Sequence, residues 1–299
     1  MAFSNERRNN FKVSRLIIHF MLAVVALSCL APFLLVISVS LTPETEIFKN
    51  GYSFIPPKIT LVAYEVILEN PQQLIDSYLV TAISTIIGTI GGLWLTATVA
   101  YVMTRKDYKY RNCISFFIFV TMLFNGGIVP TYILISRWLN MKNTVFALFV
   151  PLMVSAYFVL LMKGFIQTIP FSLIESAKID GAREIRIFTS IIIPISKPAF
   201  ATIGLFLALR YWNDWYQCLM YIEKENLYTL QYLLMRVMKN LDFLNSEYAR
   251  EILNLDQIEI PTFSARMAMC VLAAGPMVFV FPFFQKYFVQ GLTMGSIKE

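Results

Sequence analysis

Residues 78–101 read YLVTAISTIIGTIGGLWLTATVAY, which is 24 positions without a charged side chain. A helix needs about 20 apolar residues to cross the hydrocarbon core of a bilayer, so this run predicts a membrane span. Five other runs share its length and character: residues 16–40, 113–135, 144–162, 199–222 and 267–285. The alternation of polar and apolar residues that membrane barrels show is absent. Because unpaired backbone groups are too costly in lipid, we expect an all-α membrane protein with six transmembrane helices.

The composition also indicates a membrane protein. Of 299 residues, 57% are hydrophobic and only 15% are charged, and the mean hydropathy is +0.62. Soluble domains have about a quarter charged residues. A net charge of +6 suggests a nucleic-acid partner, but the basic residues fall in short segments between apolar runs, which argues against one. The cysteines lie inside apolar runs without a C-x-x-C spacing, which argues against a disulfide framework: Cys29, Cys113, Cys218 and Cys270.

The distribution of Lys and Arg predicts the orientation of the chain. Segments on the side of the N-terminus hold 15 basic and 6 acidic residues, whereas segments on the opposite side hold 9 basic and 12 acidic residues. The basic side faces the cytoplasm, so both termini are predicted to be cytoplasmic. The first run is too long for a signal peptide and no A-x-A site follows it, so we expect an uncleaved span. The predicted organisation is a tail at 1–15, a six-span domain at 16–289 and a C-terminal tail at 290–299.

Two connections between spans are long enough to fold. The outer loop 223–266 is expected to contain a helix, because Leu233, Val237 and Leu241 recur at helical spacing. The cytoplasmic loop 163–198 carries a longer pattern. Its first helix is expected to begin near 170–173, either with Pro170 at the first position or with Ser172 and Glu175 as a capping box. An apolar stripe follows: Ile174, Ala177, Gly181, Ile185 and Phe188.

The glycine in this stripe predicts a turn. Gly181 within a helix costs about 1 kcal/mol relative to Ala. We therefore expect two short helices that meet at Gly181, with Asp180 as the N-cap of the second and with Pro194 and Pro198 ending the unit. An amphipathic hairpin on the cytoplasmic face suits either the lipid headgroups or a protein partner. Its charged residues have both signs, which favours the partner slightly.

The loop residues resemble the EAA loop of ATP-binding-cassette importer permeases. That pattern is Glu-Ala-Ala, three residues, Gly, nine residues and then Ile-x-Leu-Pro. The matching residues are Glu175, Ser176, Ala177, Gly181, Ile191, Ile193 and Pro194. Two positions depart from it, Ser176 for Ala and Ile193 for Leu, and both keep size and polarity close. The string Ile179-Asp180-Gly181-Ala182 is similar to the carbohydrate-uptake branch of the family.

The resemblance implies roles for three of these residues. In the family the loop is a coupling helix that sits in a cleft of the ATPase subunit. Glu175 would then make a charge-assisted contact to that subunit, Ala177 would permit close approach and Gly181 would provide the bend. The implied partners are a second, similar permease chain, two ATP-binding subunits and an extracytoplasmic solute-binding protein in a bacterial inner membrane.

Other strings extend the resemblance over most of the chain. Asn125–Tyr132, NGGIVPTY, is similar to permeases for uronate-containing oligosaccharides such as those from pectin or alginate, which makes an oligosaccharide the implied substrate. Trp212–Trp215, WNDW, is similar to the family's Trp-Asn-Asp signature. The strings Leu227–Leu230 and Gly291–Ser296 are also similar to relatives.

Several of these residues are candidates for the substrate path, each with a structural alternative. Arg210 and Asp214 lie four apart at membrane depth, which predicts a structural ion pair, while Asn213 and Asp214 alternatively bind sugar hydroxyls. Trp212 suits sugar stacking or the interfacial aromatic belt, as does Trp215. The remaining path candidates are Gly126, Gly127 and Tyr132. With Pro130, the two glycines interrupt the third run and favour unwinding or close helix packing.

The chain carries no signature of an enzyme. His19, the one histidine, offers neither a metal site nor a catalytic pair, so we expect a structural residue. No Walker A string is present, so ATP and magnesium are expected in partner subunits and no cofactor in this chain. A self-sufficient secondary transporter or channel is the alternative, but it predicts inverted repeats or several intramembrane charges, and neither is visible. A membrane-embedded enzyme lacks a catalytic constellation.

Overall fold

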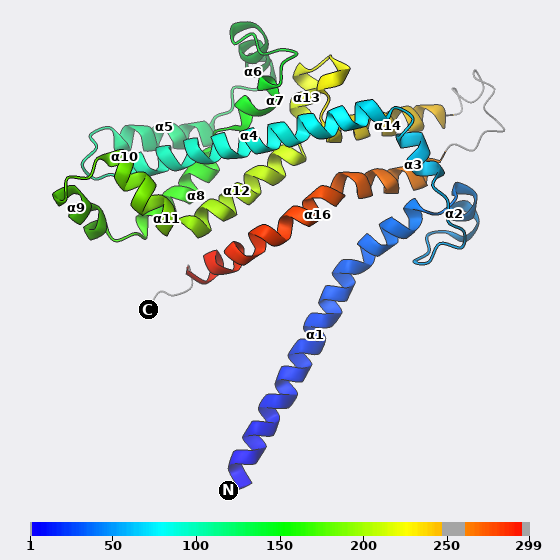
Figure 1. Cartoon of the computed structure of the whole chain (residues 1–299), viewed down its shortest axis with the longest axis horizontal. Coiled ribbons are helices and arrows are strands. Elements are labelled where there is room, and N and C mark those ends of the chain that lie inside the picture. The colour runs from blue at the N-terminus through cyan, green and yellow to red at the C-terminus, as the bar shows by residue number, and fades with distance from the viewer. Residues whose placement is uncertain (1, 247–260, 295–299) are drawn as a thin grey trace. The chain divides into compact units, whose positions relative to one another are not determined.

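A computed structural model describes residues 2–246 and 261–294, and every regular element in these ranges is helical. Figure 1 shows the elements in order along the chain. Before the EAA loop they are α1 (Ala2–Ser40), α2 (Glu44–Asn50), α3 (Val62–Ile67), α4 (Pro71–Thr104), α5 (Arg111–Leu123), α6 (Ile128–Ile133), the π-helix η1 (Leu134–Trp138), α7 (Phe146–Phe149), the 3-10 helix η2 (Val150–Leu152) and α8 (Ala156–Gln167). From that loop onward they are α9 (Phe171–Ile179), α10 (Glu184–Ile187), the π-helix η3 (Phe188–Ile192), α11 (Ile193–Ile195), α12 (Lys197–Trp212), α13 (Tyr216–Tyr221), the 3-10 helix η4 (Glu225–Leu227), α14 (Leu230–Leu244) and α16 (Thr262–Met294).

The described helices account for the predicted spans in two ways. Three are long and apolar enough to cross a membrane, within α1, α4 and α16. Three further pairs of consecutive helices, each with a sharp bend between its members, are long and apolar enough when the two helices are taken together. Counting each pair as one span gives six spans. The bends are 116° between α5 and α6–η1, 51° between α7–η2 and α8, and 83° between α10–α11 and α12. The last pair reaches back into the loop predicted at 163–198, and in that part Ile187, Phe188 and Ile192 are buried.

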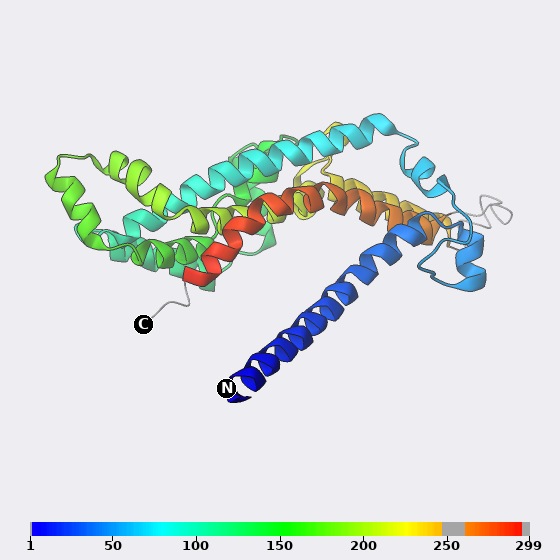
Figure 2. The same ribbon diagram turned by 60° about the horizontal axis from the view of Figure 1, so that its bottom comes forward.

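The chain divides into two compact units, residues 1–69 with 237–274 and residues 70–236 with 275–299. The second unit is built on α4, which packs against α8 and α12 (Figures 1 and 2). Asn70 starts α4 by accepting the Gln73 N–H at 3.3 Å, with Pro71 in the first turn.

Glycines of α4 allow this close packing. A Cβ on Gly88 would lie 2.4 Å from the ring of Tyr211 in α12. A Cβ on Gly92 would lie 3.0 Å from the backbone oxygen of Met153, beside α8. Small residues let membrane helices approach closely, so these positions join α4 to its neighbours.

In the first unit, a carboxylate of α2 holds the start of α16. Glu44 is buried, and its Oε1 accepts the Phe263 N–H at 2.9 Å while its Oε2 accepts the Ser264 N–H at 3.1 Å. The first amides of a helix have no partner within it, and a negative charge is favourable there. Glu44 therefore caps α16 from a distant part of the sequence.

The helix predicted in the outer loop is confirmed. It is α14, in which Leu233 and Leu241 are buried as the spacing predicted. The loop 223–266 continues through residues 247–260, which lie outside the described part. The familial string at 291–296 likewise ends outside it.

Candidate functional site

The EAA hairpin, residues 171–195, turns at Gly181 as predicted. Helix α9 ends at Ile179, with Asp180 as its C-cap, and Gly181 follows with a φ of +77°. The Ala182 N–H donates to the Ala177 carbonyl at 2.9 Å, and the Gly181 N–H donates to the Lys178 carbonyl at 3.0 Å. This pair of bonds is a Schellman motif, which needs a left-handed residue after the helix. Only glycine adopts that conformation at little cost, which explains Gly181.

Two details of the predicted capping are wrong. Ser172 makes no capping bond, and Pro170 precedes α9 at the N-cap position instead of occupying its first turn. Asp180 caps the C-terminus of α9, and α10 begins at Glu184 after the extended residue Arg183. The second helix starts later than expected because the Schellman turn lies between the two helices.

The continuous apolar stripe is also wrong after the turn. Ile174 and Phe188 are each 5% exposed, and Ala177 packs against the same core. Ile185, however, is 77% exposed, while Ile187 is buried. The turn at Gly181 resets the helical phase, so of the two stripe positions after it Ile185 fails and only Phe188 is buried as predicted.

The proposed docking residues lie mostly on the surface of the hairpin. Glu175, Ser176 and Asp180 are exposed, as is Pro194 at its end. Within the described chain, Glu175 forms no ion pair or side-chain hydrogen bond. Ala182 is half-buried and packs against the core. The hairpin thus has a buried inner side and an outer side with a free carboxylate at Glu175.

A charged cluster, the Arg105 network, ties the hairpin to the end of α4. Arg105 Nη2 lies 3.0 Å from Asp107 Oδ2 and 3.0 Å from Glu184 Oε1. Lys178 in α9 pairs with Asp107 and, at 2.9 Å, with Glu184 Oε1. The Tyr101 hydroxyl donates to Glu184 Oε2 at 2.7 Å. Helices α9 to α11 accordingly lie beside the C-terminal end of α4 in both views (Figures 1 and 2).

Arg105 is the centre of this network. Its side chain is 5% exposed, with the guanidinium 5.6 Å from the ring centre of Tyr101 and 5.8 Å from that of Phe171. Its Nε and Nη1 atoms are buried without a hydrogen-bond acceptor among the described residues. The two rings partly compensate for those donors through cation–π attraction. Span and hairpin are therefore joined by a buried cation as well as by apolar packing.

The contacts of the network shift the pKa values of its members. The hydrogen bond from Lys178 holds the pKa of the Asp107 carboxyl below its ordinary value, and the same bond raises the pKa of Lys178. Burial acts to raise the pKa of Glu184, but bonds from Tyr101 and Lys178 outweigh it and lower that pKa. All these shifts favour the charged forms at neutral pH.

Sequence reasoning missed this network. In the sequence, Arg105 and Asp107 are simply charged residues of a short segment predicted to be cytoplasmic. Lys178 and Glu184 are simply charged residues on the polar side of the predicted hairpin. The bonds that join the end of α4 to the hairpin connect residues 71–83 positions apart, so no local spacing reveals them. A signal was nevertheless present, since a charged turn follows the uncharged run 78–101 at the end of α4.

The third predicted span breaks at the glycines, as one of the two alternatives proposed. Gly127 has a φ of +87°, and α6 begins after it. A Cβ on Gly126 or Gly127 would meet no atom within 4 Å, so close packing does not explain these glycines in the described chain. Tyr132 lies beyond the break and stacks on Tyr221, with ring centres 5.7 Å apart.

The predicted ion pair between Arg210 and Asp214 is not formed. Helix α12 ends at Trp212, so the two residues are not on one helix. Asp214 instead accepts the Gln217 N–H at 3.2 Å at the start of α13, and its backbone oxygen accepts the Thr229 hydroxyl at 3.0 Å. Arg210 is exposed and forms no ion pair within the described residues. The i,i+4 rule fails here because the helix breaks.

The path candidates do not share one pocket. Trp212 is buried and lines a cavity of about 400 Å³ together with Thr85 and Thr89 of α4. The hydroxyls of both threonines are buried without a partner in the described chain. Asn213 is exposed, with its Nδ2 donating to the Leu209 carbonyl at 2.9 Å. Of the path candidates, Trp212 alone lines this cavity.

The fold and these sites define a class of protein, a helical multi-span membrane permease. The chain belongs to the family of binding-protein-dependent transport system inner membrane components, whose model matches residues 1–294. It is therefore a transport component, and the family predicted from the EAA loop is confirmed.

Named relatives cover nearly the whole chain. The polygalacturonan/rhamnogalacturonan transport system permease protein YtcP of Bacillus subtilis is 34% identical over 284 residues, 95% of this chain and 97% of that protein. Protein LplC of the same organism is 34% identical over 267 residues, 89% of this chain and 88% of that protein. A chain in the crystal structure of a bacterial ABC transporter involved in the import of the acidic polysaccharide alginate is 27% identical. Its TM-score is 0.74, and the match covers 93% of this chain and 97% of that chain.

Proposed function

We propose that the chain is a permease subunit of an ATP-driven importer of oligosaccharides, with its ATPase in separate subunits. The EAA hairpin is the observation that supports this most. It presents Glu175 without a side-chain partner among the described residues, while its inner side is held to α4 by the Arg105 network. An exposed carboxylate on a firmly anchored hairpin suits a charge-assisted contact to a second protein. The chain's own sequence supplies no phosphate-binding loop.

The proposed assembly has a second permease chain, two ATP-binding subunits that hold ATP and magnesium, and an extracytoplasmic solute-binding protein. Both termini and the hairpin are then cytoplasmic, as the basic residues suggest. ATP binding closes the ATPase dimer and moves the hairpins, and the permease pair switches from an inward-facing to an outward-facing state. This is alternating access driven by a ligand that binds one state better.

The proposed substrate is an oligosaccharide that contains uronate residues. Two of the similar proteins belong to systems named for acidic polymers, polygalacturonan/rhamnogalacturonan and alginate. Permeases named for arabino-oligosaccharides and for melibiose, raffinose and stachyose are 25–27% identical, below the 34% of YtcP. The test is uptake by the reconstituted importer, with its binding protein, of oligogalacturonates against neutral oligosaccharides of equal length. Equal uptake of both would contradict the acidic specificity.

The docking role is tested by reversing one charge. Glu175→Lys should leave the chain inserted and assembled with its membrane partner, while ATP hydrolysis no longer drives transport. Glu69→Lys makes the same reversal at an exposed position predicted on the other side of the membrane and should transport normally. Normal coupled transport by Glu175→Lys would refute the docking role.

A further inference from the structure

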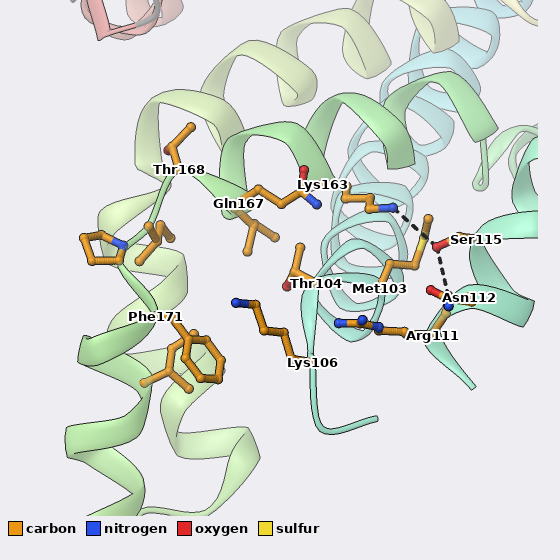
Figure 3. A pocket seen from close by; sticks show the side chains of 14 residues that line it. Met103, Thr104, Lys106, Arg111, Asn112, Ser115, Lys163, Gln167, Thr168 and Phe171 are labelled. Carbon is orange, nitrogen blue, oxygen red and sulfur yellow. Dashed lines mark hydrogen bonds between the residues drawn. The ribbon is translucent and has the colours of Figure 1, made fainter. Parts of the chain in front are cut away.

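A basic pocket, lined by Lys106, Arg111 and Lys163, lies next to the Arg105 network. It has a volume of about 510 Å³ and is formed by the ends of α4 and α8 and the starts of α5 and α9. Figure 3 shows Lys106 and Arg111 entering from the α4–α5 turn, and Lys163 and Gln167 from α8. Such a size suits a small polar group and not merely a water molecule.

The positive charge of this pocket is not neutralised from within the described chain. No Asp or Glu lines it, and none of its three cations is in an ion pair there. Lys163 Nζ has the Ser115 hydroxyl at 3.4 Å, and Lys106 Nζ lies 5.5 Å from the ring centre of Phe171. Three like charges around one cavity repel one another, so an anion is the ligand that they favour.

Neutral donors complete the lining. Asn112 and Gln167 contribute side-chain amides to the same cavity, whereas the Ser115 hydroxyl donates to the Arg111 carbonyl at 2.8 Å. Asn112 is in the first turn of α5, a helix of 13 residues whose N-terminal amides favour negative charge. Lys and Arg with backbone and side-chain N–H groups are the usual partners of phosphate oxygens.

The surroundings favour a lipid as the source of that phosphate. One to two turns beyond the pocket, α5 exposes Phe116, Phe117 and Phe119, which are 65%, 69% and 49% exposed. Aromatic side chains pack against acyl chains while basic groups hold the headgroup. Basic pockets between membrane helices on the cytoplasmic side bind anionic headgroups in this way.

We propose that this pocket binds the phosphate group of an anionic phospholipid. Phe171 and Pro170 also line it, so the bound headgroup contacts the residues that start the EAA hairpin. Lipid binding therefore strengthens the position of the hairpin at Phe171, the ring that both Lys106 and Arg105 approach. The proposal does not depend on the sugar that is carried.

The test uses the purified importer with all its subunits, stripped of lipid in mild detergent. Phosphatidylglycerol is titrated in, with phosphatidylcholine as a lipid of no net charge. Bound lipid is counted by native mass spectrometry, and the midpoint of thermal unfolding is recorded. We expect phosphatidylglycerol to bind and raise the midpoint, and phosphatidylcholine to do neither.

Charge variants distinguish binding in this pocket from general electrostatic attraction between the basic protein and an anionic lipid. Each Lys or Arg near an anionic headgroup contributes about fivefold in affinity, so Lys163→Gln and Arg111→Gln should each weaken binding about fivefold. Arg111→Lys keeps the charge and should stay within about threefold of the wild type. Lys109→Gln removes an exposed charge from the same turn but outside the lining, and it should leave affinity unchanged.

Specific outcomes overturn the proposal. Equal binding of the two lipids, or equal weakening by Lys109→Gln, would show that no specific headgroup site exists. Displacement of phosphatidylglycerol by millimolar inorganic phosphate would assign the pocket to a soluble phosphate and reject the lipid. Absence of such displacement, together with the pocket-specific losses, supports the lipid headgroup.

Discussion

Arg105 and Lys106 are neighbours in the sequence and have opposite surroundings. Arg105 is buried, paired with two carboxylates and flanked by aromatic rings, whereas Lys106 is exposed and lines a pocket without any acid. The backbone directs one side chain toward the hairpin and the next toward the pocket. A charged cluster whose members neutralise one another holds a structure together, while a cluster of one sign is available to bind a ligand.

The largest expected effect comes from removing the buried cation. Arg105→Ala leaves Glu184 and Asp107 to share Lys178, and it also removes packing against two rings. Breaking a fully buried pair costs roughly 3–5 kcal/mol. Because both carboxylates are about half exposed, we expect the free energy of unfolding to fall by about 2 kcal/mol. The measurements are a lower midpoint of thermal unfolding and a loss of ATP-coupled transport.

Lys106→Ala is the matched control for this change. It removes the adjacent positive charge without breaking an ion pair, so stability in lipid-free detergent should change by less than about 0.5 kcal/mol. A loss as large as that of Arg105→Ala would mean that net charge, and not the network, stabilises this end of the molecule.

The next largest effect is expected at the turn of the hairpin. Gly181→Ala places a Cβ on a residue with a φ of +77°, which costs about 1–2 kcal/mol. The turn brings Lys178 and Glu184 together, so this variant should also weaken coupling. Gly164→Ala in α8, where a Cβ meets no atom within 4 Å, should be neutral or slightly stabilising. Equal losses in the two variants would argue against the strained turn.

The dependence of stability on pH sharpens the comparison further. Lys178 lowers the pKa of Asp107, so its contribution is present above the ordinary carboxyl pKa and is lost as the pH falls through the lowered value. Lys178→Gln should therefore lower the free energy of unfolding at pH 7, which is seen as a lower thermal midpoint. The loss should be less than about 1 kcal/mol because the pair is partly exposed. The difference from the wild type should shrink below about pH 4. A difference that grows on acidification would contradict this assignment.

The smallest effect is expected in the pocket. Lys163→Gln removes a charge that has no ion pair among the described residues and that other cations repel. In lipid-free detergent the free energy of unfolding should therefore stay within about 0.5 kcal/mol of the wild type. Addition of phosphatidylglycerol should separate the two proteins, because only the wild type retains all three cations. A large loss without lipid would mean that Lys163 stabilises the fold directly.

Much of the architecture follows from local sequence patterns. Run length and composition predicted α4 and α16, Leu233 and Leu241 predicted α14, and Gly181 predicted the turn of the hairpin. The break after Gly127 is one of the two alternatives that the sequence left open for the glycine pair, the other being close helix packing. These features depend on residues close together in the chain, where periodicity and backbone preference act.

What the sequence did not predict depends on contacts between distant residues. Arg105 meets Glu184 across 79 positions, and Gly88 lies against Tyr211 only because α4 and α12 pack together. The supposed pair of Arg210 and Asp214 failed for a related reason, since the break of α12 after Trp212 removes the geometry that the spacing assumed. The roles assigned to Glu175 and to the path candidates stay predictions.

The cap that Glu44 places on α16 has a consequence for the order of biosynthesis. The two partners are 219–220 residues apart, so at roughly 5–20 residues per second the carboxylate is made about 10–40 s before the amides that it binds. During that time the Glu44 carboxylate lies outside the spans, where water can solvate its charge. The last span is thus fixed in place by a residue from the beginning of the chain. Until residues 263 and 264 are made, the Glu44 carboxylate lacks the backbone amides that it binds in the finished chain.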